Sequence, residues 1–326
     1  MKAAWYEGFG PAADVLTIGD LPDPEPGAGE VLVRIHATGI NPSDAKLRAG
    51  ARPGAVMEFP RIVPHSDGAG EIVAVGTGVD AGRVGERVWL WNAQWKRAFG
   101  TAAQMIALPA EQAVRLPDST SFAEGASLSI PAMTAWYAVY ADGPVAGKTV
   151  LVTGGAGTVG RYACQMAALG GARVITTVSS DAKAAHSGAA DWINYREADV
   201  AEAVMDMTSG EGVDRIVEVD FGANQAASLA VIKAGGTIAS YASAADMTPV
   251  LQFYGFMFKH VNLRMLIRYQ FSAAENRAGE AALTEWLEAG KLSHAVVPGG
   301  TLDDIAAGHD MVMAGDKLGT VVLNIE

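Results

Sequence analysis

The stretch that decides the fold is TVLVTGGAGTVG, residues 149–160, which is followed by the helical pattern RYACQMAALG at 161–170. Gly155, Gly157 and Gly160 fit the pattern G-x-G-x-x-G. In that pattern the first glycine permits a tight turn, the second lets backbone amides approach a pyrophosphate, and the third lets helix and strand pack closely. A strand before the turn and a second strand at 172–178 predict a dinucleotide site at the positive end of the helix. The alternative is a βαβ crossover whose turn binds nothing.

The rest of the chain shows two different patterns of predicted secondary structure. Before about residue 120 it is rich in short strands punctuated by Pro and Gly, which is typical of a small irregular barrel. After two helices broken at Pro131, strands and helices alternate, which predicts a parallel, doubly wound sheet. The expected strands of that sheet are 149–153, 173–178, 191–193, 215–219 and 236–240. Helices are expected at 280–292 and 301–314, and the final strand, 319–325, needs a sheet to join, with the N-terminal barrel as one candidate.

Composition limits the possible functions. The chain has 326 residues, of which 50% are hydrophobic and 18% charged, so a large core in about two domains is expected. A net charge of −12 argues against a nucleic-acid partner. The single cysteine, Cys164, allows no intrachain disulfide, and its place in an apolar helix predicts buried packing. No signal peptide or membrane-spanning run is recognisable, so a cytoplasmic enzyme is the default expectation.

The end of the second strand bears on which dinucleotide binds. A NAD site places Asp or Glu about 20 residues beyond the glycine turn, to bind the ribose 2′-hydroxyl. Here the segment is TTVSSDAK, residues 176–183. Ser179, Ser180 and Lys183 would bind a 2′-phosphate, which favours NADP, while Asp181 lies further on and could cap the next helix. The serines could instead be an N-cap pair, which does not exclude phosphate contact.

Five motifs occur in a fixed order: GINPSD (39–44), PHSDGAG (64–70), VGERV (84–88), IPAMTA (130–135) and GAGTVG (155–160). Together they resemble the medium-chain dehydrogenase/reductase superfamily, in its zinc-independent quinone oxidoreductase (zeta-crystallin-like) branch. The resemblance implies an α/β protein. A GroES-like β-barrel catalytic domain, residues 1–122 and 266–326, would surround a Rossmann NADP-binding domain, residues 123–265.

The resemblance also bears on zinc, because zinc alcohol dehydrogenases share this fold. Their zinc ligands are Cys, His and Cys where this chain has Asn41, Ser66 and Ile130, so we expect no metal. His65 stands one residue before the zinc-histidine position, where the family commonly has glycine, and is interpreted as a pocket-rim or loop histidine. Without a Lewis acid, the favoured hydride acceptors are already electron-poor, such as quinones, enones or enals.

Carried over from the family, the NADP contacts fall into groups along the Rossmann domain. They comprise the phosphate loop, the 2′-phosphate corner, a loop beside the cofactor, a strand end near the nicotinamide ribose and a crossing segment at the nicotinamide amide. In that order the residues are Ala156, Gly157, Thr158 and Val159; Ser179, Ser180, Lys183 and Tyr195; Asn224; Ser240, Tyr241, Ala242 and Ser243; and Met265, Leu266 and Ile267. Tyr195 could instead be simple packing, and residues 265–267 a buried strand.

Four residues are candidates for catalysis. Asn41 would orient the acceptor by hydrogen bonding, and Asp44 would position a cation or a ribose hydroxyl unless it only caps a helix. Thr134 matches a family threonine near the nicotinamide, or is a helix-interior hydroxyl bonded to its own backbone. Arg52 stands near the position where some enoyl reductases keep a proposed tyrosine proton donor; it cannot donate a proton as Tyr would, but could attract a carboxylate or quinone oxygen.

Three functions remain open at this point. The first is an NADPH-dependent reductase of a quinone or an activated enone or enal, the second an acrylate- or enoyl-type reductase of the same branch, and the third a non-catalytic NADPH-binding protein. The resemblance implies a homodimer that pairs through the Rossmann-sheet edge near 261–268 and a small-molecule acceptor. The acidic charge argues against nucleic acid as a partner, and the lack of a long apolar run argues against a membrane. Two roles are open for the three tryptophans Trp89, Trp91 and Trp95. They either line the binding site of an aromatic acceptor or pack in the core and at the surface.

Overall fold

The structure is a computed structural model that describes residues 1–51 and 54–325. Two compact units make up the fold. One, the barrel unit, combines Met1–Ile130 with the C-terminal segment that begins at Glu280, and the other, the Rossmann unit, is Pro131–Gly279. Both junctions lie further along the chain than the expected 122/123 and 265/266. No helix within the described residues is long and apolar enough to cross a membrane.

The Rossmann unit is built on six parallel strands in the order β10-β9-β8-β11-β12-β13. They are β8 (Thr149–Val152), β9 (Arg173–Val178), β10 (Asp191–Asn194), β11 (Val213–Glu218), β12 (Ile232–Ser240) and β13 (Asn262–Met265). The order reverses between β8 and β11, and ligands bind at such a switch point, beyond the carboxyl ends of the strands. The four- to nine-residue strands are mostly buried on both faces, which a parallel sheet requires.

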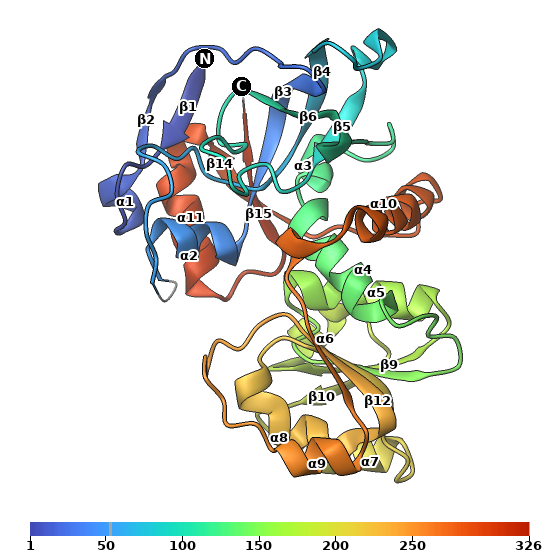
Figure 1. Cartoon of the computed structure of the whole chain (residues 1–326). Helices are drawn as coiled ribbons and strands as arrows, with labels where there is room; N and C mark the ends of the chain where they lie inside the picture. Colours follow the sequence, from blue (N-terminus) through green and yellow to red (C-terminus); the bar gives the residue numbers. More distant parts are fainter. Residues whose placement is uncertain (52–53, 326) are drawn as a thin grey trace. The chain divides into compact units, whose positions relative to one another are not determined.

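Helices cover both faces of this sheet. Figure 1 shows α4 and α5 on one face and α7, α8 and α9 on the other. The helices of the unit are α4 (Met133–Tyr140), α5 (Thr158–Leu169), α6 (Asp181–Ser187), α7 (Val200–Met207), α8 (Phe221–Val231), α9 (Phe253–Phe258) and the start of α10 (Ala273–Glu288), with the short η4 (Arg268–Gln270). The alternation predicted from the sequence is confirmed. The sequence prediction placed the start of α10 at residue 280, whereas it begins at Ala273.

The barrel unit contains a seven-stranded sheet in the order β14-β15-β3-β4-β5-β7, with β6 also paired to β3, and a separate β1–β2 pair. The strands are β1 (Lys2–Trp5), β2 (Thr17–Asp20), β3 (Glu30–Ile40), β4 (Asp67–Val75), β5 (Arg87–Leu90), β6 (Met105–Pro109), β7 (Ala113–Arg115), β14 (Val296–Thr301) and β15 (Thr320–Asn324). β15 pairs antiparallel with β3, so the expected joining of the last strand to the N-terminal sheet is confirmed.

Few helices accompany this sheet. They are α1 (Ala12–Val15), α2 (Pro42–Arg48), α3 (Phe122–Gly125) and α11 (Ile305–Ala314), with the one-turn η1 (Ala81–Arg83), η2 (Ala110–Gln112) and η5 (Leu302–Asp304). The break expected at Pro131 takes another form, because Pro131 lies inside the π-helical turn η3 (Leu128–Ala132) between α3 and α4. Such turns are frequent at functional sites.

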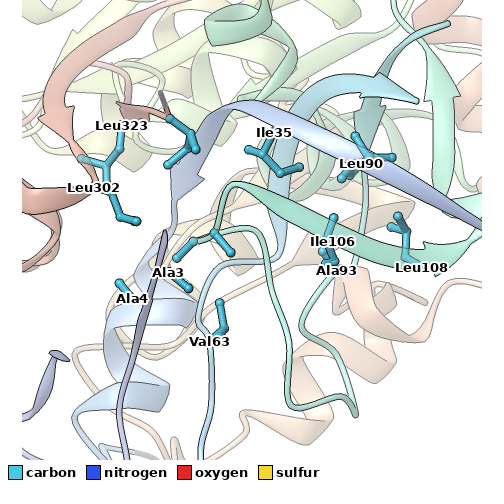
Figure 2. Close-up of a cluster of buried hydrophobic side chains, with 14 of the residues drawn as sticks. Ala3, Ala4, Ile35, Val63, Leu90, Ala93, Ile106, Leu108, Leu302 and Leu323 are labelled. Carbon is cyan, nitrogen blue, oxygen red and sulfur yellow. The ribbon is translucent and has the colours of Figure 1, made fainter. Parts of the chain in front are cut away.

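One apolar core explains why the C-terminal segment belongs to the barrel unit. Figure 2 shows Leu302 and Leu323 in the same cluster as Ile35, Leu90 and Ile106, which come from the N-terminal part of the chain. All five side chains are at most 4% exposed. Each buried aliphatic side chain of this size contributes about 1.5–3 kcal/mol, so the two chain segments stabilise each other.

A buried histidine pair also links the same two segments. His65 precedes β4 and His309 lies in α11; both are 0% exposed, and their Nε2 atoms are 2.9 Å apart. Nδ1 of His65 lies 3.0 Å from the hydroxyl of Thr38. Of the two interpretations of His65, the pocket-rim histidine is wrong because the side chain is buried, whereas the loop histidine is correct because the residue lies in the loop before β4. Because burial disfavours the imidazolium, the pKa of His65 is well below its usual value and the pKa of His309 is lowered to about 3.

The pair predicts a loss of stability in mild acid. His309 has a pKa of about 6.5 in the unfolded chain and about 3 in the folded chain. Between these two pH values, the unfolded chain binds a proton at His309 and the folded chain does not. The free energy of unfolding should therefore fall with decreasing pH, by up to about 1.4 kcal/mol per pH unit for each histidine. Urea unfolding of His309→Gln between pH 7 and 5 should show a smaller slope than the unaltered chain, and the exposed His260→Asn should not. Equal slopes in all three proteins would contradict this account.

Candidate functional site

The glycine turn between β8 and α5 has no room for side chains at two of its positions. A Cβ at Gly155 would overlap the hydroxyl of Thr176 on β9, and a Cβ at Gly160 would overlap the carbonyl oxygen of Gly154. Gly154 itself has φ +67°. These restrictions are the tight turn and the close helix-to-strand packing that the sequence pattern predicted. Ala156, Gly157, Thr158 and Val159 consequently lie at the N-terminus of α5, where helical N–H groups and the helix dipole attract phosphate.

A cavity of about 490 Å³ opens beside this turn. It lies at the switch point, because its wall includes Gly154 after β8, Thr177 in β9 and Val219 after β11. Tyr195 and Asn224 also line it. The cavity is large enough for a nucleoside, so the residues present fit a dinucleotide whose phosphates lie on the glycine turn.

A buried carboxylate that was not predicted from the sequence fixes residues of the cavity wall. Glu218, the last residue of β11, is 0% exposed. Its Oε1 accepts hydrogen bonds from the hydroxyl of Thr153 (3.0 Å) and from Nδ2 of Asn224 (2.8 Å), and its Oε2 from the hydroxyl of Ser228 (3.2 Å). Asn224 is thus fixed with its amide nitrogen toward Glu218. The available signal was an acidic residue within the otherwise apolar run IVEV, residues 216–219.

The expected 2′-phosphate corner lies where β9 passes into α6. Ser179 is 6% exposed. Ser180 is the N-cap of α6, and its hydroxyl accepts from the backbone N–H of Lys183 at 3.4 Å, so the N-cap alternative describes Ser180. Tyr195 is 50% exposed, and its backbone N–H donates to Val178 at the end of β9. The structure therefore brings these residues together at one strand end, and Tyr195 is not core packing.

The segments expected at the nicotinamide end are also neighbours. Ser240 ends β12 and pairs with Met265 at the end of β13, and the backbone N–H of Leu266 donates to the carbonyl of Ser240 at 2.9 Å. This places Ser240, Tyr241, Ala242 and Ser243 beside Met265, Leu266 and Ile267. Met265 is 70% exposed and Ile267 48%, so the alternative of a buried strand is wrong. Thr134, 5% exposed, lies in the first turn of α4 of the same unit.

In the barrel unit, Asn41 lies between β3 and α2 as the N-cap of α2, and Asp44 lies in the first turn of that helix. The Asp44 carboxylate accepts a hydrogen bond from the backbone N–H of Asn41 at 2.8 Å. Asp44 therefore does cap the helix, which was the alternative to a role in positioning a cation or a ribose hydroxyl. Nδ2 of Asn41 donates to Oδ2 of Asp67 at 3.0 Å, a contact that the sequence analysis missed. Arg52, the remaining catalytic candidate, lies outside the described residues.

The positions that hold zinc in the zinc-dependent branch do not fit a metal here. They carry the amide of Asn41, the hydroxyl of Ser66 and the aliphatic side chain of Ile130, whereas zinc sites use thiolate, imidazole and carboxylate ligands. The Asn41 amide nitrogen is committed to Asp67. Across residues 1–51 and 54–325, no group of three or more His, Cys, Asp and Glu side chains could hold a metal ion.

The three tryptophans, of which Trp89 lies in β5, differ in how deeply they are buried. Trp89 is 0% and Trp91 9% exposed, so both pack inside the barrel unit. Trp95 is half-buried, with the ammonium group of Lys96 5.8 Å from its ring centroid. Of the three, only Trp95 has appreciable surface available to a ligand within this unit.

Known proteins match this arrangement along most of the chain. Residues 27–118 match the family described as "Alcohol dehydrogenase GroES-like domain", and residues 158–285 match "Zinc-binding dehydrogenase". The quinone oxidoreductase of Rattus norvegicus is 31% identical over 244 residues, which cover 73% of this chain and 72% of the rat protein.

Solved structures agree. A mycobacterial protein complexed with NADPH superimposes with a TM-score of 0.86 at 32% identity, covering 99% of this chain and 100% of its own. A protein described as an NAD-dependent alcohol dehydrogenase superimposes with a TM-score of 0.90 at 28% identity, covering 100% of both chains. The chain therefore belongs to the medium-chain dehydrogenase/reductase superfamily, in its quinone oxidoreductase branch.

Proposed function

We propose that this protein is a zinc-independent, NADPH-dependent oxidoreductase that transfers hydride to a quinone or an activated enone or enal. The observation that carries the proposal is the glycine turn beside the 490 Å³ cavity at the switch point of the Rossmann sheet. When bound, NADPH supplies the hydride, and the protein orients it and excludes competing chemistry.

The residues that would hold NADPH are the predicted groups in the Rossmann unit. The N–H groups at the start of α5 would hold the pyrophosphate, and Ser179, Ser180 and Lys183 the 2′-phosphate. Tyr195 and Asn224, which line the cavity, would contact the nucleoside. The segments 240–243 and 265–267, with Thr134, would contact the nicotinamide half.

The acceptor would be recognised in the barrel unit by Asn41. A free amide N–H stabilises negative charge that develops on a quinone or enolate oxygen, and it does so best when it is already held in place. Quinones need little acid catalysis, which suits a site whose zinc positions carry an amide, a hydroxyl and an aliphatic chain. Asp44 supports Asn41 through its backbone, and Arg52 would attract the acceptor's oxygen.

A homodimer is proposed from the edge of the Rossmann sheet. Among the described residues, β13 pairs with β12 alone and so presents one edge of its backbone. Beside that edge in sequence, α9 exposes Phe253, Tyr254 and Phe258 by 60–81%, an amount of apolar surface that marks interfaces in soluble proteins. The cytoplasm is the proposed compartment.

The proposed activity predicts a specific order of substrates. NADPH oxidation, followed at 340 nm, should be fastest with 9,10-phenanthrenequinone, slower with an enone and slowest with an acrylate. Tight NADPH binding without turnover of any acceptor would instead support a non-catalytic binding protein, and preference for the acrylate would support the enoyl-type alternative.

The corner at the end of β9 predicts the cofactor preference. Ser179→Asp places a carboxylate where the 2′-phosphate would bind, at a cost of about 1–4 kcal/mol from charge repulsion. The ratio of kcat/KM for NADPH to that for NADH should fall by roughly tenfold or more. The control Ser209→Asp adds the same charge at the exposed end of α7 and should leave the ratio unchanged. An unchanged ratio in Ser179→Asp would refute this assignment.

A further inference from the structure

The main chain at Asp67 is held in place by strand pairing and by two hydroxyl groups. Asp67 is the first residue of β4, is 0% exposed, and pairs with Gly39 of β3. Its carbonyl oxygen accepts from the hydroxyl of Thr101 at 2.7 Å and from that of Thr38 at 3.2 Å. These two hydroxyls lie 2.7 Å apart, and Thr38 also contacts the buried His65. The strand end that carries Asp67 is therefore fixed on several sides.

The side chain of Asp67 then fixes two other parts of the barrel unit. Its Oδ2 accepts from Nδ2 of Asn41 at 3.0 Å and from the backbone N–H of Ile130 at 3.0 Å, and Oδ1 is 3.2 Å from the same N–H. Asn41 and Ile130 stand at two of the three positions that hold zinc in the related branch. One buried carboxylate thus contacts the residues at two of these three positions.

This contact decides which way the amide of Asn41 faces. An ionised carboxylate only accepts hydrogen bonds, so the amide nitrogen, and not the oxygen, must point toward Asp67. One N–H is used by this bond, which leaves the second N–H of Asn41 for another partner, while the side-chain oxygen faces the backbone N–H of Asp44 in the capping box of α2. Burying a carboxylate is costly unless it is hydrogen-bonded, and here its donors are the side chain of Asn41 and the backbone of Ile130.

We propose that Asp67 is a positioning residue for the hydride acceptor, because it fixes the amide of Asn41 in one of its two flip orientations and leaves the second N–H of Nδ2 for the acceptor oxygen. The proposal rests on the proposed function, in which Asn41 touches the acceptor. Asp67 itself acts only through Asn41. In this chain the carboxylate–amide pair orients the acceptor at the place where the related enzymes use a metal.

The test is a double-mutant cycle of Asp67→Asn and Asn41→Ala, measured on kcat for quinone reduction and on NADPH affinity. Asp67→Asn turns an acceptor into a group that also donates, so it disturbs the bond from Asn41 with little change in volume. We expect kcat to fall about 10- to 100-fold, which corresponds to about 1.4–2.7 kcal/mol, with NADPH affinity unchanged. In the Asn41→Ala background the same change should have no further effect.

A readout that does not depend on activity accompanies the cycle. In protein labelled with ¹⁵N-asparagine, the side-chain amide protons of Asn41 should be protected from exchange, and they should lose protection in Asp67→Asn. The control Asp80→Asn, which changes the exposed cap of η1, should alter neither kcat nor this protection. Losses that multiply in the double mutant would indicate a purely structural role and overturn the proposal.

A second variant keeps the test decisive if Asp67→Asn does not fold. Asn41→Asp would set two carboxyl groups against each other, which raises the pKa of the pair because both cannot be charged. Activity should then recover as pH falls and one proton bridges the two groups; a pH profile like that of the unaltered protein would contradict the proposal. If the unaltered protein reduces no quinone, the proposed function fails as well. If the unaltered protein reduces quinone and Asp67→Asn leaves kcat unchanged, only the inference about Asp67 is overturned.

Discussion

The Rossmann unit depends on the close approach of the glycine turn to β9 and to its own backbone. Gly155 faces Thr176, and Gly160 faces Gly154, with no space for a Cβ at either position. This approach brings the N-terminus of α5 against the end of β8, beside the cavity at the switch point. Glu218 then fixes residues around that cavity, since it accepts hydrogen bonds from Thr153, which follows β8, and from Ser228 in α8. A site for phosphate and nucleoside follows from this one constraint.

The barrel unit has its own buried polar centre, and it consists of two connected parts. Asp67 joins Asn41 to Ile130, and its carbonyl joins Thr38 and Thr101, which lead to the His65–His309 pair. Because the N-terminal and C-terminal segments meet at that pair, the geometry around Asn41 rests on the same packing that holds the barrel together. Buried hydrogen bonds of this kind can keep a site rigid without the help of a metal.

Local pattern was sufficient to predict the alternating strands and helices, the glycine turn and the residues at the end of β9. It failed where an outcome depends on contacts distant in sequence. His65 is buried because His309, 244 residues away, accepts or donates across the core, and no local signal marks that pair. Asp67 escaped notice for the same reason, because its partners Asn41 and Ile130 are 26 and 63 residues away in the sequence. Glu218 did carry a local signal, but its partner Thr153 is 65 residues away. The roles of Asn41, Asp44 and Thr134 toward an acceptor stay predictions.

In the proposed NADPH-dependent reductase, a carboxylate-held amide, and not a metal, serves the acceptor. The most direct measurement is the zinc content of the purified protein, taken together with its quinone reductase rate before and after treatment with a strong chelator. The account predicts no zinc bound in proportion to the chain and an unchanged rate. Stoichiometric zinc, with a rate that falls on chelation and returns on addition of Zn²⁺, would contradict it.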